Sequence, residues 1–167
     1  HGFIDEEADA FGEAFVAASL RGEETTQHGN RDARSFAQGV YRCAGEEQWV
    51  AITFRTEGQW NDFAHHFGLE ADPGGLSASA RLDEIDRRLS EWTAGKDPQW
   101  VLEQLAGRAI PVGRVLDTVT VHEDRHLNER GFWKELPHPR MHAWKQPRSA
   151  WQLREANPEM KRHAPLF

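Results

Sequence analysis

Apolar residues recur at helical spacing in the first part of the chain. Phe11, Phe15 and Ala18 fall at i, i+4 and i+7 within residues 5–20, whose first turn is acidic. This pattern predicts an amphipathic helix. A polar stretch with three glycines follows as far as residue 39. Its composition predicts a linker and a loop.

The pattern then changes to that of a β-hairpin. Two apolar runs, Val40–Cys43 and Trp49–Phe54, flank a short turn that contains Gly45. Runs of this length, separated by a turn with glycine, are typical of paired antiparallel strands.

Helical spacing returns after the hairpin. Residues 56–68 and 79–93 each carry apolar side chains along one face, and both predict amphipathic helices. Asp97 followed by Pro98 predicts an N-cap and the first residue of a third helix. That helix is expected to end near Gly107, and residues 109–116 predict a third strand.

The last forty residues show little periodicity. After Leu127 the chain carries five prolines and three tryptophans. A long stretch without regular structure is uncommon within a compact domain, so we expect an extended arm. The predicted fold is α+β: a small antiparallel sheet of about three strands with covering helices, plus an extended, proline- and tryptophan-rich C-terminal arm.

Composition narrows the function classes. The formal charge of −7 argues against nucleic acid as a partner, because binders of nucleic acid usually carry a basic patch. The one cysteine cannot form an internal disulfide. No apolar run reaches membrane-spanning length and no signal peptide is recognisable, so we expect a cytoplasmic protein without a membrane partner. Because the chain starts with histidine, we expect either a tag remnant or a piece of a longer protein.

Several stretches resemble those of a known family, in the same order. They are HGNRDARSFAQGVYRCAGEEQWVAI, RLDEIDRRLSEWT, IPVGRVLDTVTVHEDRHLNERGFW and the closing HAPLF. Together they resemble the family III CoA-transferases of the CaiB/BaiF type, which include formyl-CoA and carnitine CoA-transferases and the related α-methylacyl-CoA racemases. The resemblance covers roughly residues 25–167.

The resemblance implies a chain without its own nucleophile. In that family a large Rossmann-like domain carries most of the CoA site and the catalytic aspartate. This chain resembles the small domain and the segment that returns to the large one, so no catalytic residue and no metal ligand are expected here. The expected domains are an N-terminal helix and linker (1–38), the small domain (39–121) and a return arm (122–167).

The resemblance also implies partners and substrates. CoA and acyl-CoA would be substrates of the whole enzyme, and no further cofactor is expected. A large Rossmann-like catalytic domain or subunit, and a second copy in an interlocked homodimer, are the expected protein partners.

The loop before the first strand is the best candidate site. In formyl-CoA transferases the equivalent segment is glycine-rich, covers the active site and protects a thioester intermediate from water. Here DARSFAQG has a single glycine, so a glycine lid is not expected. Its side chains could still border the CoA pocket, and the candidate residues are Asp32, Arg34, Ser35, Gln38 and Gly39.

One motif points to different chemistry. His122, Glu123 and His126 form H-E-x-x-H, the spacing with which zinc peptidases hold their metal on one helix. The motif follows the β-branched run DTVTV, which favours a strand or an irregular turn over a helix. We therefore expect surface or turn histidines and no zinc site.

Three further features have ordinary structural explanations. Of His65 and His66, we expect one to face solvent and the other to pack beside Phe63 or Phe67. Cys43 is expected to be a small buried apolar residue.

The resemblance also suggests two further sites. A racemase would need an acid near Thr56, which only Glu57 could supply after a one-residue shift. Basic residues beside tryptophan in RMHAWKQPR and in MKRH could bind CoA phosphates, but a subunit contact is the commoner role.

Three hypotheses follow. The chain is the small-domain portion of a family III CoA-transferase, which moves CoA from an acyl-CoA donor to a carboxylic acid. Alternatively, it is a stand-alone, non-catalytic subunit of such an enzyme, or part of a racemase of the α-methylacyl-CoA type.

Overall fold

The computed structural model describes residues 12–22, 29–32, 34–69 and 76–148, together with positions 153, 155 and 160. The chain divides into two compact units, residues 1–113 and 114–167, which are described separately. The first described element is helix α2 (Gly12–Arg21). It confirms the second half of the predicted N-terminal helix, whereas Phe11 and the acidic turn lie outside the described residues.

A three-stranded sheet forms the centre of the first unit. Strands β1 (Ala37–Arg42), β2 (Trp49–Phe54) and β3 (Val112–Val115) lie in the order β1-β2-β3. β1 and β2 are antiparallel, with Ala37 opposite Phe54 and Arg42 opposite Trp49. The predicted hairpin and third strand are therefore confirmed. β1 starts earlier than predicted, so Gln38 lies in a strand rather than in the preceding loop.

The two faces of the sheet differ in burial. Side chains alternate along a strand, and in β1 and β2 every second residue is buried. The buried face carries Ala37, Tyr41, Val50, Ile52 and Phe54. The opposite face, which includes Gln38, Val40, Ala51 and Thr53, is half-buried or exposed. The second face is thus open among the described residues.

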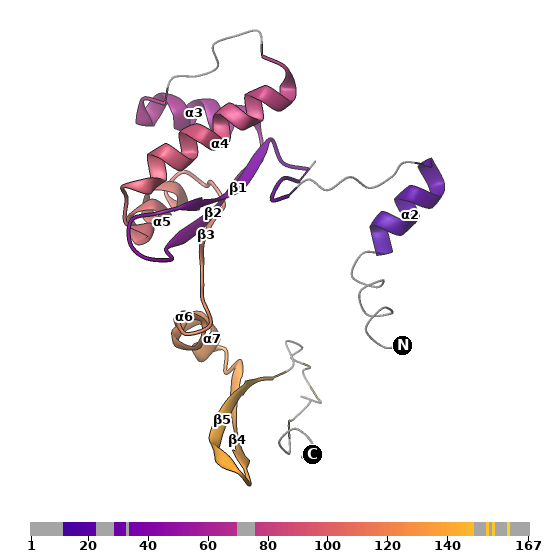
Figure 1. The fold of residues 1–167 in the computed structure, drawn as a ribbon, viewed down its shortest axis with the longest axis vertical. Coiled ribbons are helices and arrows are strands. Elements are labelled where there is room, and N and C mark those ends of the chain that lie inside the picture. Colours follow the sequence, from indigo (N-terminus) through magenta and orange to yellow (C-terminus); the bar gives the residue numbers. More distant parts are fainter. Residues whose placement is uncertain are drawn as a thin grey trace. The chain divides into compact units, whose positions relative to one another are not determined.

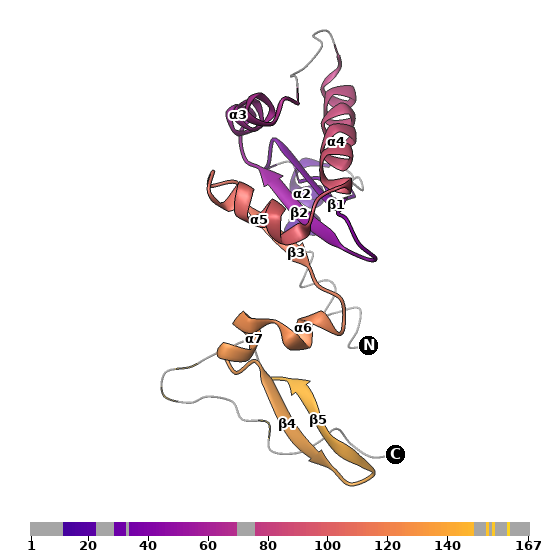
Figure 2. The same cartoon turned by 90° about the vertical axis from the view of Figure 1, so that its left-hand side faces the viewer.

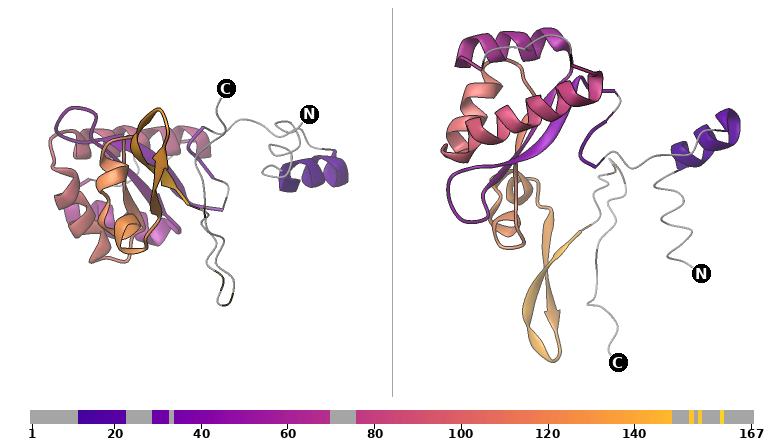
Figure 3. Two further views of the ribbon diagram at one scale, coloured as in Figure 1. Left: turned by 90° about the horizontal axis from the view of Figure 1, so that it is seen from below. Right: turned by 45° about the horizontal axis from the view of Figure 1, so that its top comes forward.

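Three capped helices cover the buried face of the sheet. They are α3 (Glu57–Phe67), α4 (Ala78–Ala94) and α5 (Pro98–Ala106). Figures 1 and 3 show them gathered around the sheet, with α4 running beside β1. The N-caps are Thr56, Ser77 and Asp97, whose side chains accept hydrogen bonds from backbone N–H groups of the first turns. All three predicted helices are confirmed, including the cap at Asp97.

Aromatic side chains dominate the core between sheet and helices. Neighbouring ring centroids lie 4.8–5.8 Å apart, mostly in tilted or edge-to-face arrangements that aromatic pairs favour. The rings belong to Phe54, Trp60, Phe63, Phe67 and Trp92. This packing fixes α3 and α4 over the sheet and so fixes the surface beside β1.

The second unit contains two short helices and a hairpin. Helices α6 (Thr120–Glu123) and α7 (Arg125–Glu129) are followed by β4 (Trp133–His138) and β5 (Met141–Pro147). β4 and β5 pair in antiparallel fashion and form the twisted ribbon in Figure 2. The pairing is irregular between Leu136 and His138, at Pro137, whose nitrogen cannot donate a hydrogen bond.

The overall class agrees with the sequence. The structure is α+β, with the small antiparallel sheet and covering helices that were predicted. The C-terminal arm was expected to lack regular structure, but its described residues contain the β4–β5 hairpin. The β4–β5 pairing itself was not predicted. Among the described helices, none has the length and apolar character needed to cross a membrane.

Candidate functional site

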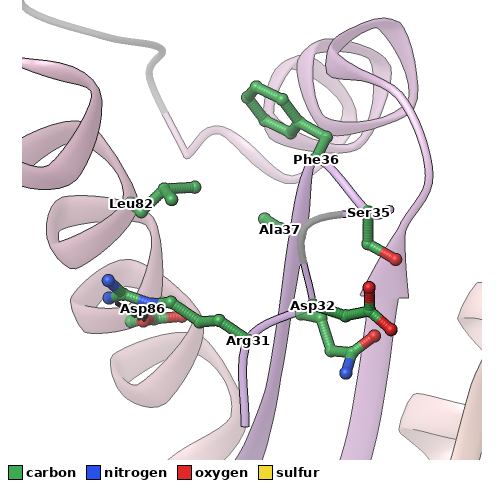
Figure 4. Close-up of a pocket in the computed structure, with 8 residues that line it drawn as sticks. Arg31, Asp32, Ser35, Phe36, Ala37, Leu82 and Asp86 are labelled. Carbon is green, nitrogen blue, oxygen red and sulfur yellow. Dashed lines mark hydrogen bonds and ion pairs between the residues drawn. The ribbon is translucent and has the colours of Figure 1, made fainter. Parts of the chain in front are cut away.

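The loop before β1 and the start of helix α4 enclose a small hollow. We define the loop segment as the described residues 29–32 and 34–36. The hollow is shown in Figure 4, and its volume of about 240 Å³ includes open solvent. Its lining residues are Arg31, Asp32, Ser35, Phe36, Ala37, Gln38, Leu82 and Asp86. Three of the five predicted site residues, Asp32, Ser35 and Gln38, are therefore brought together here.

A second, more open hollow lies on the open face of the sheet. Its volume of about 740 Å³ includes open solvent. The lining residues are Gly29, Asn30, Arg31, Asp32, Gln38, Gly39, Val40, Ala51 and Thr53. Gly39 joins Asp32 and Gln38 here, whereas Arg34 lines neither of these two hollows and its side chain is 78% exposed.

The loop segment is folded by its own hydrogen bonds. Asp32 accepts from the backbone N–H of Arg34 at 2.8 Å and from its guanidinium Nη2 at 2.8 Å. The side-chain and backbone hydrogen bonds from Arg34 lower the pKa of Asp32 to about 2. The N–H of Ser35 donates to the carbonyl of Asp32, and Gln38 Nε2 donates to the carbonyl of Asn30, both at 3.0 Å. The segment is therefore a closed turn rather than an open chain.

A charged network that the sequence did not predict ties this segment to helix α4. Arg31 Nη2 lies 2.6 Å from Asp83 Oδ1 and 2.5 Å from Asp86 Oδ2. The other oxygen of Asp86, Oδ1, accepts a hydrogen bond from the Tyr41 hydroxyl at 2.7 Å. Figure 4 shows Arg31 extending toward Asp86 on α4, whereas Asp32 points the other way.

The environment of this network favours its charged, hydrogen-bonded form. Burial, and then the hydrogen bond to Asp86, raise the pKa of Tyr41, so its hydroxyl stays protonated and donates. The hydrogen bonds to Asp86 and Asp83 raise the pKa of Arg31. One signal in the sequence could have indicated the pair: Asp83 and Asp86 are three residues apart and therefore share one face of a helix.

Gly39 has a steric role in the same network. Gly39 and Tyr41 are two residues apart in β1 and share its buried face, and the Tyr41 ring lies over Gly39. A Cβ at position 39 would lie 2.6 Å from Cζ of Tyr41. The ring can reach Asp86 along this path because residue 39 has no side chain.

Comparison with known proteins identifies the family. The model of CoA-transferase family III matches residues 4–167. The chain belongs to this family. The expected resemblance is thereby confirmed.

Individual relatives of this family III chain are CoA-transferases. A probable CoA-transferase of Mycobacterium tuberculosis is 30% identical over 106 residues, which cover 60% of this chain and 13% of that protein. The succinyl-CoA:mesaconate CoA-transferase of Haloarcula hispanica is 27% identical, covering 72% of this chain and 31% of that protein. The formyl-CoA:oxalate CoA-transferase of Streptomyces avermitilis is 29% identical, and the match covers 71% of this chain and 31% of that protein. The chain thus spans less than a third of the length of these curated relatives.

A solved structure shares the fold of this family III chain. The crystal structure of a CaiB/BaiF family protein from Brucella suis matches with a TM-score of 0.74 at 15% sequence identity. The match covers 95% of this chain and 42% of that protein.

A racemase would need an acid at Thr56 or Glu57, and both residues have structural partners in this chain. The Thr56 hydroxyl accepts from the N–H of Gln59 at 3.3 Å and caps α3. Glu57, the shifted alternative, forms an ion pair with Arg81. Both positions therefore make structural contacts in the first unit.

The H-E-x-x-H residues lie on two helices rather than one. The Asp124 side chain accepts from the N–H of Leu127 at 2.8 Å, so α7 begins where α6 has just ended. The motif was expected to lie in a strand or an irregular turn. Instead, it spans two short helices that meet at a break at Asp124. His126 is exposed, whereas His122 is half-buried and its ring centroid lies 4.1 Å from that of Trp133. The expected surface or turn role of His122 is thus replaced by a packing role.

His65, His66 and Cys43 behave as expected. His65 is exposed and His66 packs against the Phe67 ring, with centroids 4.7 Å apart. Cys43 is 2% exposed, and burial raises the pKa of its thiol, which disfavours the reactive thiolate.

The basic residues of the arm are only partly described. Lys145 lies in β5 opposite Glu135, and the neighbouring Trp144 is 57% exposed. Apart from Met160, the stretch MKRH lies outside the described residues. The subunit contact expected of these residues stays a prediction, as does the less favoured phosphate-binding role.

Proposed function

We propose that this chain is the small-domain portion of an enzyme that moves CoA from an acyl-CoA donor to a carboxylic acid. The match to CoA-transferase family III over residues 4–167 carries the proposal. The relatives named above support transfer as the reaction, since their names describe CoA transfer.

We place the reacting aspartate of this enzyme outside the chain. A carboxylate that attacks a thioester needs an accessible oxygen lone pair with high electron density. The two carboxylates that line the hollows are already engaged: Asp32 by Arg34, and Asp86 by Arg31 and Tyr41. The side-chain and backbone hydrogen bonds from Arg34 lower the pKa of Asp32, which makes its oxygens weaker nucleophiles.

The proposed chemistry is a sequence of acyl exchanges on that external aspartate. Its carboxylate attacks the acyl-CoA carbonyl, which forms a mixed anhydride and releases the CoA thiolate. The thiolate attacks the aspartyl carbonyl, which forms an aspartyl-CoA thioester and releases the donor acid. The acceptor carboxylate then attacks this thioester, which forms a second mixed anhydride and frees the CoA thiolate. The thiolate attacks the acceptor acyl carbonyl of this anhydride, which forms the new acyl-CoA and restores the aspartate.

In this scheme the chain supplies one wall of the reaction chamber. The loop segment and the open face of β1 and β2 carry the described hollows, so this surface is the proposed wall. A large Rossmann-like domain or subunit would supply the aspartate and most of the CoA site, and a second copy would complete an interlocked dimer.

The test uses the native polypeptide that carries this chain. It would be captured from source cells with an antibody against residues 1–167 and sized on a denaturing gel. Succinyl-CoA and formyl-CoA then serve as donors with a panel of carboxylic acids, and new acyl-CoA species are followed by mass spectrometry. We expect a polypeptide longer than this chain, or a co-purifying catalytic subunit, and transfer to at least one acid.

The control is the 167-residue chain by itself, which we expect to be inactive. Transfer by the isolated chain would contradict an external aspartate. Absence of transfer from both donors by the captured native protein would contradict the proposed function.

A further inference from the structure

The loop segment is fixed to the rest of the first unit through one carboxylate. Asp86 uses its two oxygens for different partners: Oδ2 accepts from Nε and Nη2 of Arg31, and Oδ1 accepts from the Tyr41 hydroxyl. Arg31 belongs to the loop segment, Tyr41 to β1 and Asp86 to α4. A single side chain therefore joins three separate pieces of chain.

The position of Asp86 is itself well determined. Helix α4 is held by core residues such as Leu89, which is fully buried. Tyr41 is 3% exposed and reaches Asp86 over the bare backbone of Gly39. By contrast, the side chain of Arg31 is 34% exposed. Tyr41 and Asp86 are thus fixed by the core, and through Arg31 they hold the loop segment.

Arg31 and Asp86 form a half-buried, charge-assisted pair, and such a pair can hold a loop. Arg31 offers two nitrogens to Asp86 and also contacts Asp83, so the guanidinium is fixed in direction as well as in distance. The loop segment is further joined to β1 by the Gln38 amide, which donates to the carbonyl of Asn30. The turn at Asp32–Ser35 lies between these two attachments.

We infer that Asp86, together with Tyr41 and Arg31, is a positioning residue that clamps the loop segment in place beside the hollows. The clamp stands on the contacts of this chain alone. Its consequence for CoA chemistry rests on the proposed function, in which the loop segment is part of the wall of the reaction chamber. A wall held in place would also keep water from the thioester intermediate.

The clamp is tested by amide hydrogen exchange on the 167-residue chain, followed residue by residue by NMR. Asp86→Asn keeps the size of the side chain but removes the charge that holds Arg31. The reporters are the N–H groups of Arg34 and Ser35, which are hydrogen-bonded within the turn. We expect their exchange to accelerate about tenfold or more, with the β1–β2 amides unchanged.

The matched control is Glu84→Gln, which removes a carboxylate from the same helix. Glu84 pairs with Arg87 and Arg88, which lie on α4 and not in the loop segment. Equal exchange in Asp86→Asn and Glu84→Gln would overturn the clamp. Acceleration in β1–β2 as large as in the turn would also overturn it, because Asp86 would then act on the stability of the whole unit.

A second variant isolates the strand side of the network. Tyr41→Phe removes the hydroxyl and leaves the Arg31–Asp86 pair intact. We expect faster exchange at Arg34 and Ser35 than in the wild type, but slower than in Asp86→Asn. If Arg34 and Ser35 exchange as slowly in Tyr41→Phe as in the wild type, Tyr41 is not part of the clamp. The inference that three residues form the clamp would then be overturned.

The functional consequence is measured on the native polypeptide with succinyl-CoA. Loss of folded enzyme lowers transfer and hydrolysis together, whereas a loosened loop segment raises the share of hydrolysis. We expect Asp86→Asn to raise the ratio of hydrolysis to transfer about tenfold, and Glu84→Gln to leave it unchanged. An unchanged ratio in Asp86→Asn would overturn the shielding role. A wild-type protein that does not process succinyl-CoA or formyl-CoA would instead contradict the proposed function, and the exchange result would still decide the clamp.

Discussion

At the scale of single residues, Gly39 and Tyr41 show how closely β1 is constrained. The Tyr41 ring occupies the space that a side chain at position 39 would need, and its hydroxyl is held by Asp86. A residue that is buried and hydrogen-bonded cannot move aside freely. Position 39 therefore requires glycine for packing rather than for mobility.

We expect Gly39→Ala to lower the free energy of unfolding by about 1–3 kcal/mol, the usual cost of overpacking a core. Urea denaturation measures this change. The matched control is Gly95→Ala, because a Cβ at Gly95 would meet nothing within 4 Å. Equal stability of the two variants would show that the Tyr41 ring moves at little cost.

Glu84 gives a prediction for pH. Hydrogen bonds from Arg87, and then from Arg88, lower its pKa from an ordinary 4.5 to about 2. Because the folded pKa is below the unfolded one, the stabilisation is fully present above pH 4.5 and is lost as the pH falls through 2. Glu84→Gln should therefore lose less of its thermal stability than the wild type between these pH values.

The double variant Arg87→Gln/Arg88→Gln provides the complementary measurement. It keeps Glu84 but removes the guanidinium donors, so its pH dependence should flatten in the same way. Melting temperatures of both variants that run parallel to the wild type from pH 4.5 to 2 would refute this role of Glu84.

At the scale of elements, local sequence patterns predict the helices and strands of the first unit well, but not those of the second. In the first unit, α3, α4 and α5 have apolar faces and side-chain caps at Thr56, Ser77 and Asp97, and these signals are local. In the second, β4 and β5 pair across a sequence interrupted by Pro137, with no regular alternation of burial along β4. Such pairing depends on cross-strand contacts, which a linear pattern does not reveal.

The same distinction applies to the candidate site. The resemblance to formyl-CoA transferases placed one continuous segment near a pocket, and that segment contains Asp32, Ser35 and Gln38. Asp86 could not be placed there, because its contact with Arg31 joins residues 55 positions apart. Helix spacing indicated that Asp83 and Asp86 share a face, but not which residue of the loop they meet.

The cap of α5 provides a test at this scale. Asp97 accepts from the N–H groups of Gln99 at 2.8 Å and Trp100 at 3.2 Å. We expect Asp97→Ala to cost about 1 kcal/mol in urea denaturation, the typical value for a lost N-cap. Asp97→Asn keeps an acceptor oxygen and should cost less. A cost for Asn as large as for Ala would point to the charge of Asp97 rather than to its capping hydrogen bonds.

At the scale of the whole molecule, the core is confined to one part of the chain. All residues of the main hydrophobic cluster among the described positions lie between Ala37 and Ile110. A two-stranded hairpin such as β4–β5 is only marginally stable by itself in water. The first unit should therefore fold without the second, whereas the second should not fold by itself.

We expect a shortened chain of residues 29–116 to fold without the second unit. It should show a cooperative unfolding transition and the near-UV circular dichroism of packed tryptophans. The matching piece, residues 117–167, should show no cooperative transition. Loss of the transition in residues 29–116 would mean that the core needs contacts from elsewhere in the chain.

The central claim is that this chain belongs to a CoA-transferase whose reacting aspartate lies elsewhere. The most direct measurement traps the covalent intermediate on the native protein. The protein is incubated with succinyl-CoA or formyl-CoA, quenched, digested, and searched by mass spectrometry for the peptide that carries CoA. We predict a CoA thioester on an aspartate outside residues 1–167. A CoA thioester on a residue of this chain, Asp32 or Asp86 included, would contradict the account.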